Sequence, residues 1–211
     1  VLPAMMKDMS THEMNVIRTL GLTKRFGKET VVESLELQVP SGVVYGFLGP
    51  NGSGKSTTMK MLLGLMEPTA GEVYLFGQRL NHSNRARLLR TIGSMIEAPP
   101  GYGHLTGWEN MCVVESMLGL ERRNIEQALE TVHLTAHKDK LVKNYSLGMK
   151  QRLGIAMALA RNPKLLILDE PANGLDPAGI EEIRRLVRDL ASDGVTVMVS
   201  SHLLGEIDRT A

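Results

Sequence analysis

"VVYGFLGPNGSGKSTTMKMLLGLM", residues 43–66, decides how the rest of the chain is interpreted. It opens with a short apolar run, continues through the glycine-rich segment from Gly49 to Thr57, and ends in a stretch with helical periodicity. The glycine-rich segment matches G-x-x-x-x-G-K-[ST], a pattern that is specific when a strand precedes it and a helix follows it. We therefore predict a phosphate-binding loop between a buried strand and a helix.

The residue types in this loop each have a physical reason. Glycines let the backbone wrap so that successive N–H groups point at phosphate oxygens, and the following helix adds the positive end of its dipole. Lys55 is expected to reach the β- and γ-phosphates, and the Ser56 hydroxyl is expected to bind Mg²⁺. The residues predicted to contact the nucleotide here are Gly49, Pro50, Asn51, Gly52, Ser53, Gly54, Lys55, Ser56 and Thr57.

A second segment, "LLILDE" at residues 165–170, supplies two carboxylates directly after an apolar run. In open α/β sheets, ligands bind at the carboxyl ends of the strands. Asp169 is therefore a candidate Mg²⁺ ligand, and Glu170 is a candidate to orient or deprotonate an attacking water. The two segments together predict a nucleoside triphosphatase.

Three short runs that are apolar on both faces are typical of central strands in a parallel sheet. They are "VVYGFLG", "LLILDE" and "VTVMVSSH", and helical stretches separate them; the one at residues 178–194 repeats apolar residues at Ile183, Leu186, Val187 and Leu190. Strands that alternate with helices predict a doubly wound α/β core.

Other segments add to this core. Residues 16–42 alternate and carry turn residues, which predicts antiparallel strands at one edge, and residues 72–80 are predicted as one further strand of this kind. From about residue 96 to residue 161, helical periodicity replaces the strand pattern, so we predict an inserted helical lobe. We expect one domain over residues 15–211, with residues 1–14 as an N-terminal extension outside the fold.

The composition excludes several classes of protein. Apolar residues make up 43% of the 211 residues and charged residues 22%, as in an ordinary soluble domain, and the formal net charge of +1 gives no field that favours nucleic acid. The chain has no apolar run of about 18 residues that could span a bilayer. The single cysteine, Cys112, rules out an internal disulfide, suits a reducing compartment and is expected to be a small buried residue.

From about residue 15 to its end, the order of motifs resembles that of the ATP-binding-cassette (ABC) ATPases. The residues that carry the resemblance are Phe26, the loop at residues 49–57, Glu97, the helix start at residues 146–151, the acidic strand at 165–170, the loop at 174–177, and His202. The family fold is a phosphate-loop NTPase core with a parallel sheet, an antiparallel edge and an inserted helical lobe.

The resemblance implies a role for each of these positions. Phe26 would stack on adenine, a contact worth roughly 1–3 kcal/mol in nucleic-acid cases, and Glu97 would bind Mg²⁺. His202 would contact the γ-phosphate and the attacking water, as a catalytic residue beside Glu170. Asp176 would contact a partner subunit. The alternatives are a core position for Phe26, a buried hydrogen-bonded histidine at His202, and a plain turn at Asp176.

"YSLGMKQRLG", residues 145–154, looks like a helix that begins at an N-cap serine. In ABC ATPases this helix of one subunit covers the ATP held by another, with its free N–H groups and positive dipole at the γ-phosphate. Ser146 and Gly148 would therefore contact the nucleotide of the partner. We expect ATP-dependent, head-to-tail dimerisation, as a homodimer or a heterodimer.

Two departures from the common family pattern are informative. The usual Leu-Ser-Gly-Gly-Gln is replaced by "YSLGMKQ", and the usual glutamine of the lobe is Glu97. Both departures look like those of ATPases from bacterial exporters of lantibiotics, bacitracin and related antimicrobial peptides. The resemblance implies an ATP-hydrolysing subunit that powers such an exporter in self-immunity or resistance. It would work with separate membrane permease subunits, on the cytoplasmic face of the bacterial membrane.

Two other hypotheses remain open at this point. One is a soluble ABC-type ATPase that acts on other machinery, although translation-acting members carry two cassettes and a charged linker. The other is an ATP-sensing dimerisation module without turnover, against which the presence of Glu170 and His202 argues. Because family members usually continue beyond "SSHLLGEIDRTA", we also expect the chain to be truncated at its C-terminus.

Overall fold

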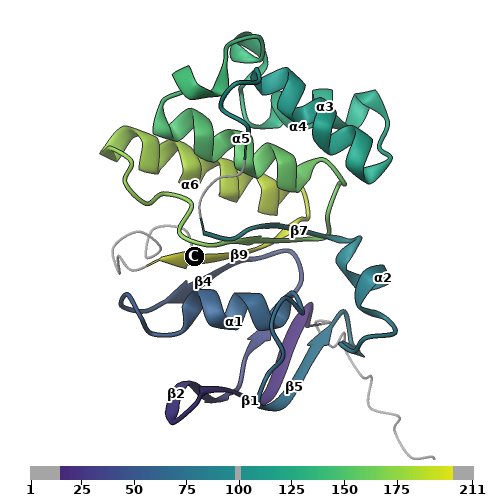
Figure 1. Cartoon of the computed structure of the whole chain (residues 1–211), viewed down its shortest axis with the longest axis vertical. Helices are drawn as coiled ribbons and strands as arrows, with labels where there is room; N and C mark the ends of the chain where they lie inside the picture. Colours follow the sequence, from purple (N-terminus) through teal and green to yellow (C-terminus); the bar gives the residue numbers. More distant parts are fainter. Residues whose placement is uncertain (1–14, 98–100, 202–211) are drawn as a thin grey trace, which may run out of the picture.

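The computed structural model describes residues 15–97 and 101–201. Figure 1 shows these residues in layers, with α5 (Leu147–Leu159) and α6 (Pro177–Ser192) over one face of a parallel sheet. Helix α1 (Lys55–Leu62) covers the other face, and an antiparallel sheet lies beyond it. The predicted fold class is therefore confirmed.

The parallel sheet positions the candidate site. Its strands follow the order β4 (Val44–Leu48), β9 (Thr196–Ser201), β8 (Leu165–Leu168) and β7 (Ile92–Met95). In the parallel register Phe47 lies opposite Ser200, and Leu168 lies opposite Val199. The carboxyl ends of β4, β9 and β8 therefore meet at one edge, where the phosphate loop and Asp169 begin.

The second sheet is antiparallel, as predicted for residues 16–42. Its strands are β1 (Ile17–Phe26), β2 (Glu29–Leu35), β3 (Gln38–Val39), β5 (Ala70–Leu75) and β6 (Gln78–Arg79). The prediction of one continuous strand over residues 72–80 is wrong, because Phe76 and Gly77 adopt φ angles of 51° and 75°. Two successive residues with positive φ make a tight hairpin turn, so the segment folds back on itself.

Between β7 and β8 the described part of the chain is helical, apart from its connecting segments. It forms α3 (Gly107–Leu118), α4 (Arg122–Thr131), two short 3₁₀ turns, η1 (Thr135–His137) and η2 (Val142–Asn144), and then α5. Helix α3, strand β7 and the short α2 (Arg85–Leu89) were not predicted individually from the sequence. A signal for α3 does exist: Thr106 and Glu109 form a capping box, in which each side chain accepts a hydrogen bond from the other residue's backbone N–H.

The two faces of the parallel sheet pack into two hydrophobic clusters. Alternate residues of β8 divide between them: Leu166 and Leu168 belong to the cluster on the side of α5 and α6, and Leu165 and Ile167 to the cluster on the side of α1. The four apolar residues predicted for α6 are all buried. Cys112 is a free thiol that is only partly buried against the first cluster.

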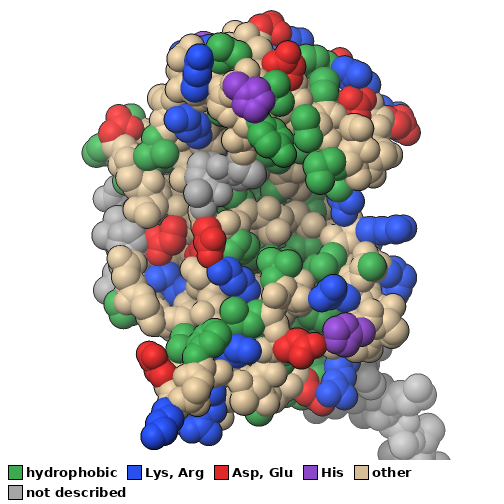
Figure 2. Space-filling model, in the orientation of Figure 1, with side chains coloured by type: hydrophobic (Ala, Val, Ile, Leu, Met, Phe, Trp, Pro, Cys, Tyr) green, Lys and Arg blue, Asp and Glu red, His purple; other side chains and the backbone are tan. Residues whose placement is uncertain are grey.

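The surface fits the near-neutral composition. Figure 2 shows acidic and basic side chains interspersed over the visible face, without a large region of one sign. Across residues 15–97 and 101–201, the structure has no helix that is both long enough and apolar enough to span a bilayer.

Candidate nucleotide-binding site

The glycine-rich loop wraps between β4 and α1 in a conformation that its glycines permit. Gly52 and Gly54 have φ angles of 82° and 86°, which side chains other than glycine rarely adopt. A Cβ atom on Gly54 would also lie 2.7 Å from the carbonyl oxygen of Val31. The backbone N–H of Gly49 donates to the carbonyl of Ser201, at 3.2 Å, and so ties the start of the loop to β9.

Lys55, the first residue of α1, lies at the end of this loop and contacts two of its oxygen atoms. Its side chain is only 7% exposed, and Nζ donates to the carbonyl oxygens of Gly49 and Pro50 at 2.7 and 3.1 Å. The ammonium also pairs with Oε1 of Glu170 at 3.2 Å. Three oxygen atoms thus surround a nearly buried cation, and a phosphate oxygen could take the place of one of them beside the ammonium group.

A cavity of about 310 Å³ opens beside Lys55. Its lining residues are Val31, Asn51, Gly52, Gly54, Lys55, Ser56, Thr57 and Glu170. The lining therefore combines most of the predicted phosphate-contacting residues with the predicted catalytic carboxylate.

The two carboxylates after β8 have different environments. Asp169 is 3% exposed, and its Oδ1 accepts a hydrogen bond from Ser200 Oγ at 2.5 Å. The backbone N–H of Glu170 donates to the same Oγ at 2.8 Å. Glu170 has a φ of 50°, and such strain in a non-glycine residue costs of the order of 1–3 kcal/mol and often marks a functional position. Ser200 was not singled out from the sequence, although a hydroxyl in a buried, mostly apolar strand is a usable signal.

The predicted metal ligands are only partly brought together. Within the described residues, no three His, Cys, Asp or Glu side chains gather to hold a metal ion by themselves. The Ser56 hydroxyl and the Asp169 carboxylate belong to the two segments that meet at the sheet edge, and they are hard oxygen donors of the kind that Mg²⁺ takes beside phosphate oxygens. This donor chemistry fits Mg²⁺.

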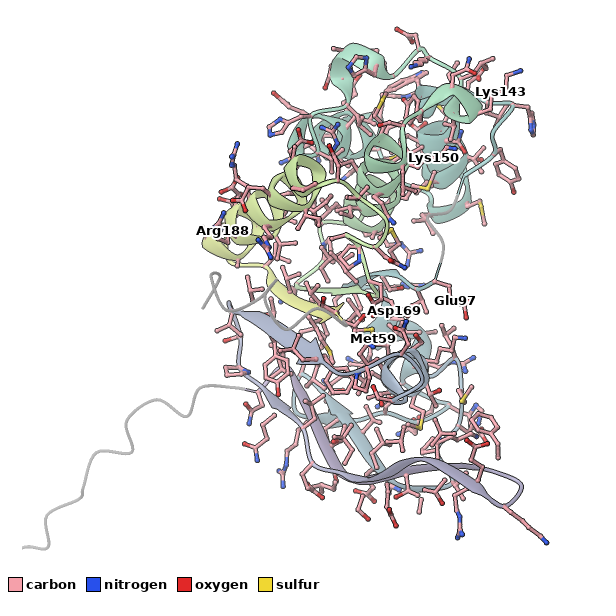
Figure 3. The ribbon with its side chains drawn as sticks, turned by 90° about the vertical axis from the view of Figure 1, so that its left-hand side faces the viewer. Met59, Glu97, Lys143, Lys150, Asp169 and Arg188 are labelled. Carbon is pink, nitrogen blue, oxygen red and sulfur yellow. The ribbon has the colours of Figure 1, made fainter. Side chains whose placement is uncertain are left out.

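Glu97 lies differently. Its carboxylate pairs with Nζ of Lys60 on α1, and its side chain is 65% exposed. In Figure 3, Glu97 points away from Asp169, toward the edge of the molecule. In this structure the Glu97 carboxylate is therefore paired with Lys60 and turned away from Asp169.

Phe26 is not a core residue. It ends β1 with 48% of its surface exposed, and Nζ of Lys24 lies 5.2 Å from the centre of its ring. The alternative of a core position is wrong, and the ring is accessible for stacking on a planar group.

The remaining predicted site residues, for the nucleotide or for the partner subunit, lie at helix starts. Ser146 is the N-cap of α5 and accepts a hydrogen bond from the backbone N–H of Met149 at 3.2 Å. Asp176 is the N-cap of α6 and accepts from the backbone N–H of Gly179 at 3.1 Å. Neither Asp176 nor Ser146 lines the cavity beside Lys55, and Gly148 does not line it either.

The start of α5 is open to the outside. Ser146 and Leu147 are exposed, whereas Gln151, one turn further along, is only 5% exposed. A Cβ atom on Gly148 would meet only the side chain of Leu175, at an ordinary distance of 3.8 Å. This chain's own packing therefore does not require a glycine at position 148. His202 lies outside the described residues.

A family model described as "ABC transporter" matches residues 32–173, which include the phosphate loop, the start of α5 and both carboxylates. The chain belongs to the ABC transporter family. This match confirms the resemblance to the ABC ATPases that the order of the sequence motifs indicated.

Curated relatives match nearly the whole chain. Over 196 residues it is 48% identical to the bacitracin transport ATP-binding protein BcrA of Bacillus licheniformis, a match that covers 92% of this chain and 64% of BcrA. It is 46% identical to the lantibiotic transport ATP-binding protein SrtF of Streptococcus pyogenes, with 93% of this chain and 84% of SrtF covered. The chain thus spans less than two thirds of the length of BcrA and most of the length of SrtF.

A solved structure supports the same assignment. The ATP-binding cassette MJ0796, determined as a dimer in a post-hydrolysis state bound to ADP and Pi, has a TM-score of 0.77 and 28% sequence identity with this ABC family member. The match covers 90% of this chain and 89% of MJ0796.

Proposed function

We propose that this chain binds ATP with Mg²⁺, hydrolyses the ATP, and thereby powers a multi-subunit membrane exporter. Its cargo would be a lantibiotic or a related antimicrobial peptide, in self-immunity or resistance. The relatives named as bacitracin and lantibiotic transport ATP-binding proteins support the choice of cargo. The observation that carries the proposal is the contact between Lys55 and Glu170 at the open edge of the parallel sheet.

The chemistry follows from the side chains at this edge. The loop N–H groups and Lys55 bind the phosphates, and Phe26 stacks on the adenine. Ser56 and Asp169 would hold Mg²⁺, which would offset the negative charge on the phosphates when it is bound. Glu170 orients the attacking water and accepts its proton. Its carboxylate must therefore break its ion pair with Lys55 when a phosphate binds to the ammonium group.

Glu97 and His202 complete the proposed site. Glu97 would join the metal ligands only after it leaves Lys60, because the two side chains are paired in this structure. His202 would contact the γ-phosphate, since it follows directly on the strand end at Ser201.

A second copy of the chain, or a related subunit, would complete each site. Ser146 and Gly148 would cover the nucleotide of the partner, and Asp176 would contact the partner beside it. The exposed start of α5, with a glycine that its own packing does not require, supports this arrangement. The solved MJ0796 dimer supports it as well.

The remaining partners are separate membrane permease subunits, which would hold the chain at the cytoplasmic face of the bacterial membrane. We propose one ATPase domain over residues 15–211, with a helical lobe at about 96–161 that docks on the permease. Tyr102 and Met117 are exposed by 55% and 77% on this lobe and offer apolar contact surface. Nucleic acid is not a proposed partner.

The test begins with release of phosphate from ATP by the purified chain in the presence of Mg²⁺. Glu170→Gln should abolish steady hydrolysis and keep nucleotide binding. Glu115→Gln is a matched control, because Glu115 also pairs with a basic side chain and has a similar exposure of 17%, against 20% for Glu170. Hydrolysis that persists unchanged in Glu170→Gln would contradict the assigned role.

The transport function needs cells. Co-expression of the chain with its permease should raise resistance to bacitracin or to a lantibiotic, each assayed separately. Lys55→Ala should remove that resistance. Resistance that survives this substitution would show that ATP binding by this chain does not drive export.

A further inference from the structure

Ser200 connects the two carboxylates of the site. It lies in β9 opposite Phe47 of β4, between the strand that enters the phosphate loop and the strand that Asp169 follows. Its Oγ is 2.5 Å from Oδ1 of Asp169 and 2.8 Å from the backbone nitrogen of Glu170. The residue is 1% exposed, so water does not compete for these bonds.

The directions of these hydrogen bonds follow from the chemistry of the groups. A backbone N–H can only donate, so Ser200 Oγ must accept from Glu170, and its single proton is left for Asp169. The proton and one of the two lone pairs of the hydroxyl are thereby used. In the part of the chain that the structure describes, this is the one hydrogen bond to the Asp169 carboxylate. It involves Oδ1 and not Oδ2.

Ser200 and Asp169 also face the correct side of the sheet. Met198 and Ile167 belong to the cluster on the side of α1. Side chains two residues apart on a strand lie on the same face, so Ser200 and Asp169 lie toward the helix that begins with Lys55 and Ser56.

We infer that Ser200 is a positioning residue of this site: its hydroxyl orients the Asp169 carboxylate for the metal ion and holds the backbone of Glu170 in its left-handed conformation. The inference rests on the proposed function. It explains why Glu170 keeps a φ of 50°, because the hydrogen bond of its own N–H to Ser200 stabilises that conformation. A single buried hydroxyl thus aligns the metal ligand with the proposed general base.

The direct test is Ser200→Ala, with Ser200→Thr as the variant that keeps the hydroxyl. Binding of Mn²⁺ together with a non-hydrolysable ATP analogue is followed by electron paramagnetic resonance of the free ion. Binding of ADP without metal is measured in parallel. Groups that orient a metal ligand typically change metal affinity by 10- to 100-fold when they are removed. We expect Ser200→Ala to weaken Mn²⁺ binding by about tenfold, to leave metal-free ADP binding unchanged, and Ser200→Thr to recover most of the loss.

Thr196→Val is the matched control. Thr196 lies on the same strand, is equally buried at 1%, and its hydroxyl also accepts a hydrogen bond from a backbone N–H, that of Gly42. It lies at the opposite end of β9 from the site. Thr196→Val should lower the melting temperature without a change in Mn²⁺ binding, which separates a general loss of stability from a change in orientation.

The outcomes distinguish the two proposals. Wild-type Mn²⁺ binding in Ser200→Ala, or an equal loss in Thr196→Val, would overturn the role of Ser200. If the wild-type chain binds Mn²⁺ with the analogue but hydrolyses no ATP, the proposed function fails, while the Mn²⁺ titrations still decide the role of Ser200. Failure of the wild-type chain to bind Mn²⁺ with the analogue would overturn both.

Discussion

Lys55 forms an ion pair with Glu170 at the position where the proposed function requires a phosphate group. The ammonium and the carboxylate are 3.2 Å apart, with side-chain exposures of 7% and 20%. A bound phosphate must therefore replace a carboxylate that already neutralises Lys55. We predict that Glu170→Gln binds ADP more tightly than the wild-type chain, because the competing negative charge is removed.

The distance between the two groups sets the size of this effect. Two unit charges 3.2 Å apart attract by about 5 kcal/mol at an effective dielectric constant of about 20. Desolvation of a nearly buried ammonium and the partial exposure of the carboxylate offset most of that attraction, which leaves of the order of 1–2 kcal/mol. A difference of this size corresponds to about 5- to 30-fold in affinity.

ADP is the appropriate ligand for this measurement. It carries the β-phosphate that Lys55 reaches, but it has no γ-phosphate for the α5 helix of a partner to cover. Isothermal titration calorimetry at protein concentrations where ultracentrifugation shows monomers then isolates the charge effect. Glu115→Gln, which breaks an ion pair in the helical lobe, should bind ADP as the wild-type chain does. Equal or weaker ADP binding by Glu170→Gln would refute the reasoning, because the carboxylate would then not compete for Lys55.

Asp176→Ala should lower the free energy of unfolding by about 1 kcal/mol in urea, because it removes the N-cap of α6, and Asp176→Asn should keep most of the stability. Burial, and then the charge of Asp139, raise the pKa of Tyr145 above 10.0, so its contribution to stability is complete below that pH and is lost as the pH rises further. Tyr145→Phe should therefore flatten the alkaline decline in melting temperature. Finally, Ser53→Cys and Gly148→Cys are combined with Cys112→Ala and Glu170→Gln in one chain. With ATP bound, disulfide crosslinks between positions 53 and 148 should join different chains.

Each of these has a result that would count against it. For the cap, Asp176→Ala and Asp176→Asn would be equally stable. For the tyrosine, the melting temperatures of the wild-type chain and of Tyr145→Phe would fall in parallel above pH 10. For the dimer, crosslinks would form only within single chains in the ATP-loaded state.

Local patterns predicted much of the fold. The strand, loop and helix around the phosphate site follow from apolar runs and glycines, and the buried stripe of α6 follows from a period of 3.6 residues. The same reasoning missed α3, although its capping box is visible in the sequence, and it failed where the elements are short. Strand β7 has four residues and α2 has five, too few for a period to show. The hairpin after β5 depends on positive φ at Phe76, which a bulky residue rarely adopts.

The sequence by itself identified four chemical groups of the candidate site. Lys55, Ser56, Asp169 and Glu170 stand in local patterns whose spacing is tied to their chemistry. These patterns can be recognised without knowledge of the fold, because a glycine loop before a helix and a carboxylate after a buried strand each involve only a few neighbouring residues.

Only the tertiary structure decided which of these groups touch. The ion pair between Lys55 and Glu170, the hydroxyl of Ser200 between two carboxyl-bearing residues, and the ion pair between Glu97 and Lys60 join segments far apart in the chain. Such contacts depend on the register of parallel strands and on the packing of the helices between them. A period in the sequence shows which face of an element is buried but not which segment packs on it, because the partners of a side chain across a parallel sheet are set by crossover connections and not by neighbours along the chain.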